Sequence, residues 1–140
     1  MATGELLVSD VMTRLLVTVR PDESLLSAWE LLSRGDIHHL PVVSGERCVS
    51  VVDDRIVGAA IANPLLSRRR RVADVMPQRV HCVLADTPLR RVAEIMRLES
   101  ATAVPVVDQH LRLLGLVTDR DVVGAVAVHG VARTPWSAHD

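Results

Sequence analysis

The segment Thr118–Asp121 combines a hydroxyl, two carboxylates and an arginine within four residues. It follows an apolar run and opens a predicted helix, where backbone N–H groups are free. The Asp121 carboxylate can accept hydrogen bonds from both vicinal hydroxyls of a ribose, and the Thr118 hydroxyl can meet a ribose or phosphate oxygen. Arg120 and the positive end of the helix suit a phosphate. These residue types therefore have the chemistry to hold a nucleoside phosphate.

The same four residues also have a purely structural interpretation. Thr-x-x-Asp at a junction between a strand and a helix is an ordinary helix-capping arrangement, in which the side chains satisfy free backbone groups. These four residues alone leave both interpretations open. Choosing between them requires knowing which helices and strands surround the segment.

The composition excludes several classes of protein. The chain has 140 residues, 49% of them hydrophobic, with a net charge of −1 and two Trp but no Phe or Tyr. A core must therefore be built from aliphatic side chains. No run approaches the 18 or so apolar residues of a membrane span, and the N-terminus lacks the basic start and apolar run of a secretory signal, so we expect a cytoplasmic protein. Balanced charge argues against nucleic acid as a partner.

No arrangement typical of an enzyme stands out. Cys48 and Cys82 have no neighbouring second cysteine or clustered histidines, which speaks against a zinc site, and both are expected to be reduced and buried. The chain shows no Ser/His/Asp order and no Cys–His pairing. We therefore expect neither catalysis nor a metal or other obligatory cofactor.

Two copies of one unit make up most of the chain. Val8–Met12 recurs as Val72–Met76, and Leu40–Val43 recurs as Val104–Val107, both at a separation of 64 residues. Such spacing indicates a tandem duplication. It predicts a first repeat over 8–62, a connector over 63–71, a second repeat over 72–130 and a C-terminal tail over 131–140.

Each repeat predicts a short opening helix followed by a β-α-β-β-α order, so the fold class is α+β. Ser24 and Thr87 stand at helix N-cap positions, Pro88 suits a first turn, and Gly35 suits a left-handed helix end. The Pro-containing strands are apolar on both faces and should be central. The predicted strands are 17–19, 40–43, 48–52, 80–83, 104–107 and 113–118, and the predicted helices are 24–34, 54–62, 88–98 and 119–128.

The repeat resembles the CBS domain family. The resemblance rests on the Asp-Val-Met starts, the Leu/Val-Pro-Val-Val strands and, most specifically, Gly115–Asp121. The tandem arrangement is similar to a CBS pair, or Bateman module, with pseudo-twofold symmetry. This resemblance implies a regulatory module that binds an adenine nucleotide or S-adenosylmethionine between its repeats. It also implies a homodimer formed through the helices, and a protein partner that the module regulates.

Family positions can be carried onto this chain residue by residue. Thr118, Arg120 and Asp121 match ribose- and phosphate-facing positions, and the segment before the first Pro-containing strand matches the adenine slot. His38 or His39 would reach a phosphate and make binding pH-sensitive, although both also suit the polar lining of a cleft. The other implied lining residues are Thr13, Val17, Thr18, Ile37 and Thr102.

The matching stretch of the first repeat, Ser50–Gly58, departs from the pattern. Asp53 stands where Thr118 would be, no carboxylate matches Asp121, and Asp53 with Asp54 would repel a phosphate. We therefore expect one ligand per chain. A fold that is kept only as a dimerisation scaffold, with no small-molecule ligand, is the alternative.

The run Arg68–Arg71 is the strongest charge feature. It suits a solvated connector, a patch facing a phosphate or a partner, or, less well without stacking aromatics, a nucleic-acid contact.

Overall fold

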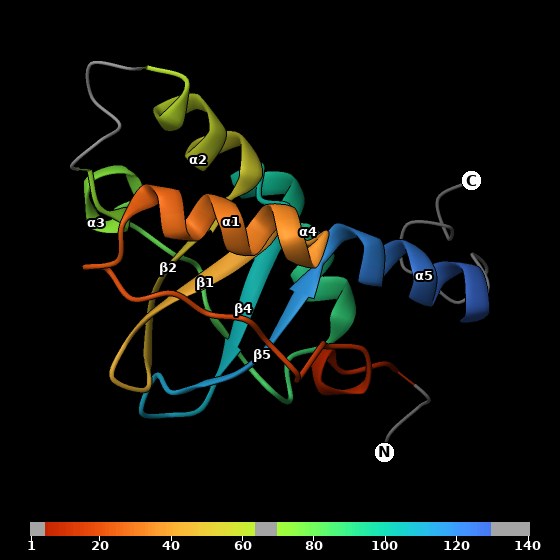
Figure 1. Ribbon diagram of the computed structural model, residues 1–140. Helices are drawn as coiled ribbons and strands as arrows, with labels where there is room; N and C mark the ends of the chain where they lie inside the picture. The colour runs from red at the N-terminus through yellow and green to blue at the C-terminus, as the bar shows by residue number, and fades with distance from the viewer. Residues whose placement is uncertain (1–4, 64–69, 130–140) are drawn as a thin grey trace. The chain divides into compact units, whose positions relative to one another are not determined.

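The computed structural model describes residues 5–63 and 70–129 (Figure 1). The predicted tail over 131–140, together with Arg68 and Arg69 of the arginine run, lies outside the described residues. The elements mix helices and strands in the predicted order, so the α+β fold class is confirmed.

The chain forms two compact units whose boundaries differ from those of the sequence repeats. The repeat 1 unit comprises Leu15–Val80 with His110–Leu113, and the repeat 2 unit comprises Met1–Arg14, His81–Gln109 and Leu114–Asp140. The opening helix of each repeat therefore belongs to the compact unit of the other repeat. Each unit has its own hydrophobic core.

The repeat 1 unit contains a two-stranded antiparallel sheet and three helices. Strands β1 (His39–Ser44) and β2 (Arg47–Asp53) pair through a tight turn at Gly45, whose φ of 64° suits glycine. Helices α1 (Leu25–Gly35) and α2 (Asp54–Ile61) pack side by side (Figure 1), and α3 is a single turn over Val72–Val75.

Aliphatic side chains fill this core, as the composition requires. Trp29 lies outside it, against Gly58 of α2, where an added Cβ would come within 3.1 Å of the indole ring. The fully or nearly fully buried members of the core are Val19, Leu25, Ala28, Leu32, Leu40, Val42, Val52, Val57 and Val72.

Two residues of the arginine run are anchored in this unit. The Arg70 carbonyl accepts a hydrogen bond from the Leu25 backbone N–H at 3.1 Å. The Arg71 guanidinium donates to the Asp22 carbonyl, and its backbone N–H donates to the Asp74 carboxylate at 2.8 Å. These hydrogen bonds tie Arg70 and Arg71 to the repeat 1 unit, while the Arg71 side chain is exposed.

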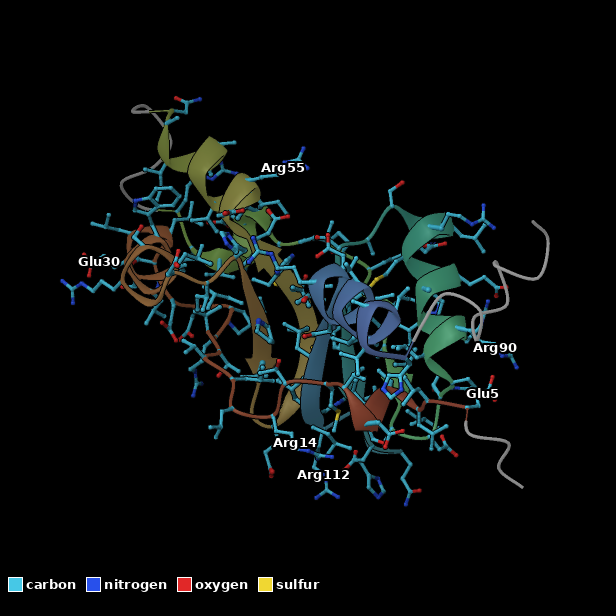
Figure 2. All side chains as sticks on the ribbon, turned by 90° about the vertical axis from the view of Figure 1, so that its right-hand side faces the viewer. Glu5, Arg14, Glu30, Arg55, Arg90 and Arg112 are labelled. Atoms are coloured by element: carbon cyan, nitrogen blue, oxygen red, sulfur yellow. The ribbon has the colours of Figure 1, made fainter. Side chains whose placement is uncertain are left out.

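The repeat 2 unit contains a three-stranded sheet in the order β3-β4-β5. Its strands are β3 (Val83–Leu84), β4 (Ala103–Val107) and β5 (Leu113–Thr118), and β3 runs parallel to β4. The prediction that the Pro-containing strand is central is confirmed for β4. Helices η1 (Val8–Asp10), α4 (Leu89–Glu99) and α5 (Asp119–His129) complete the unit. Outside its core, Glu5 and Arg90 form an ion pair (Figure 2).

The first strand of each repeat is shorter than predicted. In repeat 1, Val19 alone forms a parallel bridge, to Val42, and in repeat 2 the pairing starts at Val83. The next bond toward the N-terminus would need the backbone N–H of Pro41 or Pro105, which proline lacks. The prolines of the central strands therefore limit the pairing of the neighbouring strand.

The structure corrects two predicted helix ends, the left-handed C-terminal end of α1 and the N-cap of α4. The left-handed residue after α1 is Asp36 (φ 50°), not Gly35, and Ser100 (φ 54°) ends α4 in the same way. Aspartate tolerates this conformation because its short polar side chain can bond locally. At the other end, the prediction for Ser24 is confirmed, because its side chain accepts from the Ser27 N–H. In contrast, Pro88 rather than Thr87 occupies the N-cap of α4.

Candidate functional site

Strand β5 runs directly into α5, and this junction carries the predicted ligand-binding carboxylate. One oxygen of Asp121, Oδ2, accepts from the Thr118 backbone N–H at 2.8 Å and from the Thr118 hydroxyl at 3.2 Å. Both side chains are half-buried. These contacts satisfy the N-terminus of the helix and fix the orientation of the carboxylate.

The capping contacts leave part of this pair unused. Within residues 5–63 and 70–129, the second oxygen of Asp121 accepts no hydrogen bond. The Thr118 hydroxyl donates its hydrogen bond to Asp121, but its oxygen keeps lone pairs that can accept another. The geometry therefore contains the cap that the structural interpretation predicts, together with an oriented acceptor that capping does not require.

Thr102 and Arg120 lie at the same junction. The Thr102 carbonyl accepts from the Asp119 backbone N–H at 3.0 Å, which ties the start of β4 to the first turn of α5. Arg120 is exposed, and its guanidinium has no partner among the described residues. An incoming anion would therefore meet a charge that is not already neutralised by a bonded carboxylate.

Thr13 is held against β5 by two backbone hydrogen bonds. Its N–H donates to the Leu116 carbonyl and its carbonyl accepts from the Leu116 N–H, both at 2.9 Å. This close approach requires Gly115, since an added Cβ would lie 2.6 Å from the Met12 sulfur and 3.0 Å from the Thr13 carbonyl oxygen. The repeat 2 unit therefore brings together five predicted site residues, namely Thr13, Thr102, Thr118, Arg120 and Asp121.

The remaining five predicted residues belong to the repeat 1 unit. Val17 is 45% exposed and Thr18 is half-buried just before the Val19 bridge, while Ile37 packs partly against the core. His39 begins β1 opposite Asp53.

His38 is engaged with an aspartate of its own unit. Its Nδ1 lies 2.9 Å from Asp54 Oδ2, and the Asp54 backbone N–H donates to the His38 carbonyl at 3.1 Å. The hydrogen bond from His38 is the main cause that lowers the pKa of Asp54 below its ordinary value of 3.8. Asp54 is therefore charged at neutral pH.

The junction between β2 and α2 is the counterpart of the β5–α5 junction and is built differently. Asp53 caps α2 directly, because its Oδ1 accepts from the Ile56 backbone N–H at 2.8 Å. Ser50, fully buried in the position of Gly115, donates its hydroxyl to the Pro77 carbonyl at 2.9 Å. The sequence interpretation missed this contact, although the separation of 64 residues pairs Pro77 with Thr13 and proline has no N–H to offer β2.

In the parts of the chain that the structure describes, no three His, Cys, Asp or Glu side chains gather as a metal ion would require. In the same ranges, no helix is long and apolar enough to cross a bilayer.

Comparison with known proteins agrees with this architecture. L-aspartate semialdehyde sulfurtransferase of Methanocaldococcus jannaschii is 29% identical over 117 residues, which is 83% of this chain but 22% of that enzyme. The chain thus spans about a fifth of the length of this curated relative.

Two solved CBS pairs are similar over nearly their whole length. The CBS domain pair of protein MJ0100, in complex with 5′-methylthioadenosine and S-adenosyl-L-methionine, has a TM-score of 0.81 and 25% identity over 90% of this chain and 99% of that one. CBSX2 of Arabidopsis thaliana in complex with AMP has a TM-score of 0.78 and 30% identity over 88% and 97%. The CBS domain model matches residues 8–62 and 72–128. The chain therefore belongs to the CBS domain family and is a tandem pair of CBS domains.

Proposed function

We propose that this CBS pair is a non-catalytic regulatory module that binds one adenosine-containing ligand, either an adenine nucleotide or an adenosyl compound such as S-adenosylmethionine. The observation that carries the proposal is the Thr118–Asp121 pair, which holds a carboxylate in place and leaves one of its oxygens unused. A ribose presents two adjacent hydroxyls, both of them donors, and this carboxylate can accept from both.

The neighbouring groups support a phosphate beyond the ribose. The Arg120 side chain and the positive end of the α5 helix dipole favour an anion. Thr13 and Thr102 lie in the same unit, and we assign Val17, Thr18, Ile37, His38 and His39 of the repeat 1 unit to the adenine and phosphate. The ligands in the solved MJ0100 and CBSX2 structures are adenosine-containing, which supports this ligand class.

Signalling is proposed to act through a homodimer of this module. Several apolar side chains on the helices are exposed, including Leu26 (58%), Trp29 (37%), Val123 (67%) and Val128 (79%). Such side chains suit a helix-mediated interface. A ligand changes the packing of a dimer, and with it the binding of a partner protein in the cytoplasm, only through different affinities for two arrangements.

Thermal unfolding with AMP, ADP, ATP and S-adenosylmethionine tests the ligand. At one hundred times Kd the bound ligand should stabilise the chain by about 2.7 kcal/mol. Asp121→Asn should remove most of this stabilisation, because the amide keeps an acceptor for the Thr118 N–H but loses the charge. Asp119→Asn is the matched control, because it removes the same charge two residues before Asp121 and leaves the contacts between Thr118 and Asp121 in place. Equal stabilisation of both variants would refute the role of Asp121.

A dimerisation scaffold without a small-molecule ligand is the second candidate. It is favoured by the departure of the repeat 1 junction from the ligand-binding pattern, where Ile56 stands in the place of a carboxylate. Under this alternative no adenine compound shifts the unfolding temperature, while light scattering still finds a dimer.

A further inference from the structure

Helix α1 of repeat 1 carries an apolar stripe on its exposed side. Four residues make up this α1 stripe, spaced three or four apart so that they share one side of the helix, namely Leu26, Trp29, Glu30 and Ser33. Leu26 is 58% exposed and Trp29 is 37% exposed. The charge of the stripe is Glu30, which projects outward in Figure 2 and lies 3.9 Å from Arg34 in a long, exposed ion pair. The α1 stripe is therefore apolar and weakly acidic.

The equivalent surface on α4 of repeat 2 is positively charged. At a separation of 64 residues, the positions of Leu26, Trp29, Glu30 and Ser33 are taken by Arg90, Ala93, Glu94 and Arg97. Arg90 and Glu94 already form ion pairs, with Glu5 and Arg91. Arg97 is exposed, and among residues 5–63 and 70–129 its guanidinium has no hydrogen-bond or ion-pair partner. An uncompensated cation on α4 thus stands where α1 has an apolar, weakly acidic surface.

The two surfaces also differ in bulk, in a complementary way. In repeat 1 the Trp29 indole covers Gly58 of α2, where an added Cβ would come within 3.1 Å of the ring. Counted from the helix start, the residue of α5 that corresponds to Gly58 is Val123, and it is 67% exposed. Ala93 stands in the place of the indole, so α4 supplies no ring to cover this valine. Repeat 1 therefore has a bulky aromatic side chain at the position where repeat 2 has exposed apolar surface.

We propose that the chain forms an antiparallel dimer, in which the α1 stripe of one copy packs against α4 and α5 of a second copy. This inference rests on the proposed homodimer and adds its orientation. In a twofold dimer the contact forms twice, because each copy offers both surfaces. Trp29 then covers Val123 of the second copy, and its ring faces the Arg97 guanidinium in a cation–π contact. Glu30 adds an opposite charge beside this arginine.

A parallel dimer would place each surface against its own copy. Arg97 would then face the positively charged surface of the second α4, and like charges at an interface oppose association. The apolar α1 stripes would cover each other, while Val123 and Arg97 would gain no complementary group from α1. Charge and bulk therefore both favour the antiparallel orientation.

Sedimentation of the full chain with the charge of Arg97 reversed tests the orientation. In the antiparallel dimer, Arg97→Glu should raise the dimer Kd at least about tenfold, because a carboxylate replaces the cation beside Trp29 and Glu30. Adding Glu30→Arg to Arg97→Glu should restore most of the affinity, since opposite charges then meet again across the interface. Arg79→Glu is the matched control, an exposed arginine outside the helices and strands, and it should dimerise as the parent chain does.

Crosslinking gives a second readout that does not depend on affinity. Copies with Glu30→Cys are mixed with isotope-labelled copies with Glu94→Cys and treated with a short bismaleimide, both in a Cys82→Ala background because Cys48 is buried. Crosslinks between the two kinds of copy support the antiparallel dimer. Crosslinks within one kind, or an Arg97→Glu variant that dimerises as well as the parent, would overturn it and leave the homodimer itself standing. A parent chain that is monomeric at every concentration would refute the proposed homodimer and this inference with it.

Discussion

The two junctions between a strand and a helix, β2–α2 and β5–α5, perform the same structural task with different chemistry. In both, a carboxylate satisfies a free N–H at the helix start. In repeat 1 the carboxylate is Asp53, which precedes the helix and accepts from Ile56, whereas in repeat 2 it is Asp121, which lies inside the helix and reaches back to Thr118. In each junction only one oxygen of the carboxylate takes part in these bonds, so the two arrangements differ in where the carboxylate lies, before the helix in repeat 1 and within its first turn in repeat 2.

The segments beside the two junctions differ as well. In repeat 2, Gly115 permits Thr13 to approach β5 and exchange two backbone hydrogen bonds. In repeat 1, Pro77 has no N–H to exchange, and Ser50 supplies a side-chain hydroxyl instead. The comparison teaches that a junction which has lost the carboxylate of the ligand-binding pattern can still be a well-satisfied piece of structure.

The largest effect is expected when repeat 2 is given the residue of repeat 1. Gly115→Ser would force a side chain against the Met12 sulfur and the Thr13 backbone oxygen, so the free energy of unfolding should fall by about 1–3 kcal/mol in denaturant unfolding. Gly124→Ser is the control, because a Cβ there meets nothing within 4 Å. Equal stability of the two variants would show that Thr13 is not held as described.

A calorimetric titration should sharpen the difference in ligand binding. With the proposed adenosine ligand, one site per chain should fill first, and any second site should be at least about tenfold weaker, because Asp53 places a carboxylate where repeat 2 has the neutral Thr118 and Ile56 stands in the place of Asp121. Two equally tight sites per chain would mean that the built-in differences between the junctions do not affect binding.

Ser50→Ala should have a smaller effect on the repeat 1 junction. It removes the hydrogen bond to the Pro77 carbonyl, which lies in an exposed residue and can be rehydrated, so the free energy of unfolding should fall by about 1 kcal/mol. Ser44→Ala, at the exposed end of β1, serves as the control for the loss of a hydroxyl. If the two variants have the same free energy of unfolding, the Ser50 hydroxyl does not replace the backbone hydrogen bonds that repeat 1 lacks at this junction.

The smallest effect is a pH dependence specific to repeat 1. The pKa of Asp54 is lowered by His38, so its contribution to stability is present above the ordinary value of 3.8 and is lost as the pH falls through the lowered pKa. The Asp54 side chain is 41% exposed, so the contribution should be a few tenths of a kcal/mol. In unfolding measured from pH 6 to about pH 3, His38→Gln should lose less stability than the parent chain. A parallel loss in both would contradict this pairing.

Local patterns were enough to predict the duplication, the helices and the central strand, because hydrophobic periodicity and tight turns act over a few residues. Contacts between distant segments were harder. Because Pro41 and Pro105 have no backbone N–H, the strand that would pair with each of them, some 20 residues earlier in the chain, is shorter than predicted. The cross-strand pair of Arg47 and Arg112 depends on a register that neither segment specifies alone.

The candidate site likewise contains contacts that the local sequence predicts and contacts between distant segments that it does not. Thr118 and Asp121 were predicted together because three residues separate them along one turn of helix, and the structure confirms that they touch. Nothing in the local sequence shows that Gly115 is there to admit Thr13, which lies about 100 residues away. Backbone approaches of this kind become visible only in three dimensions.

The exchange of opening helices has a consequence for how the chain can be divided. Val8 is fully buried in the core of the repeat 2 unit, and Val72 is fully buried in the core of the repeat 1 unit. A cut at the connector would therefore produce two fragments that each carry the other's missing piece. The duplication, plain in the sequence as two consecutive copies, is in the folded chain a reciprocal exchange, and neither copy is an autonomous module.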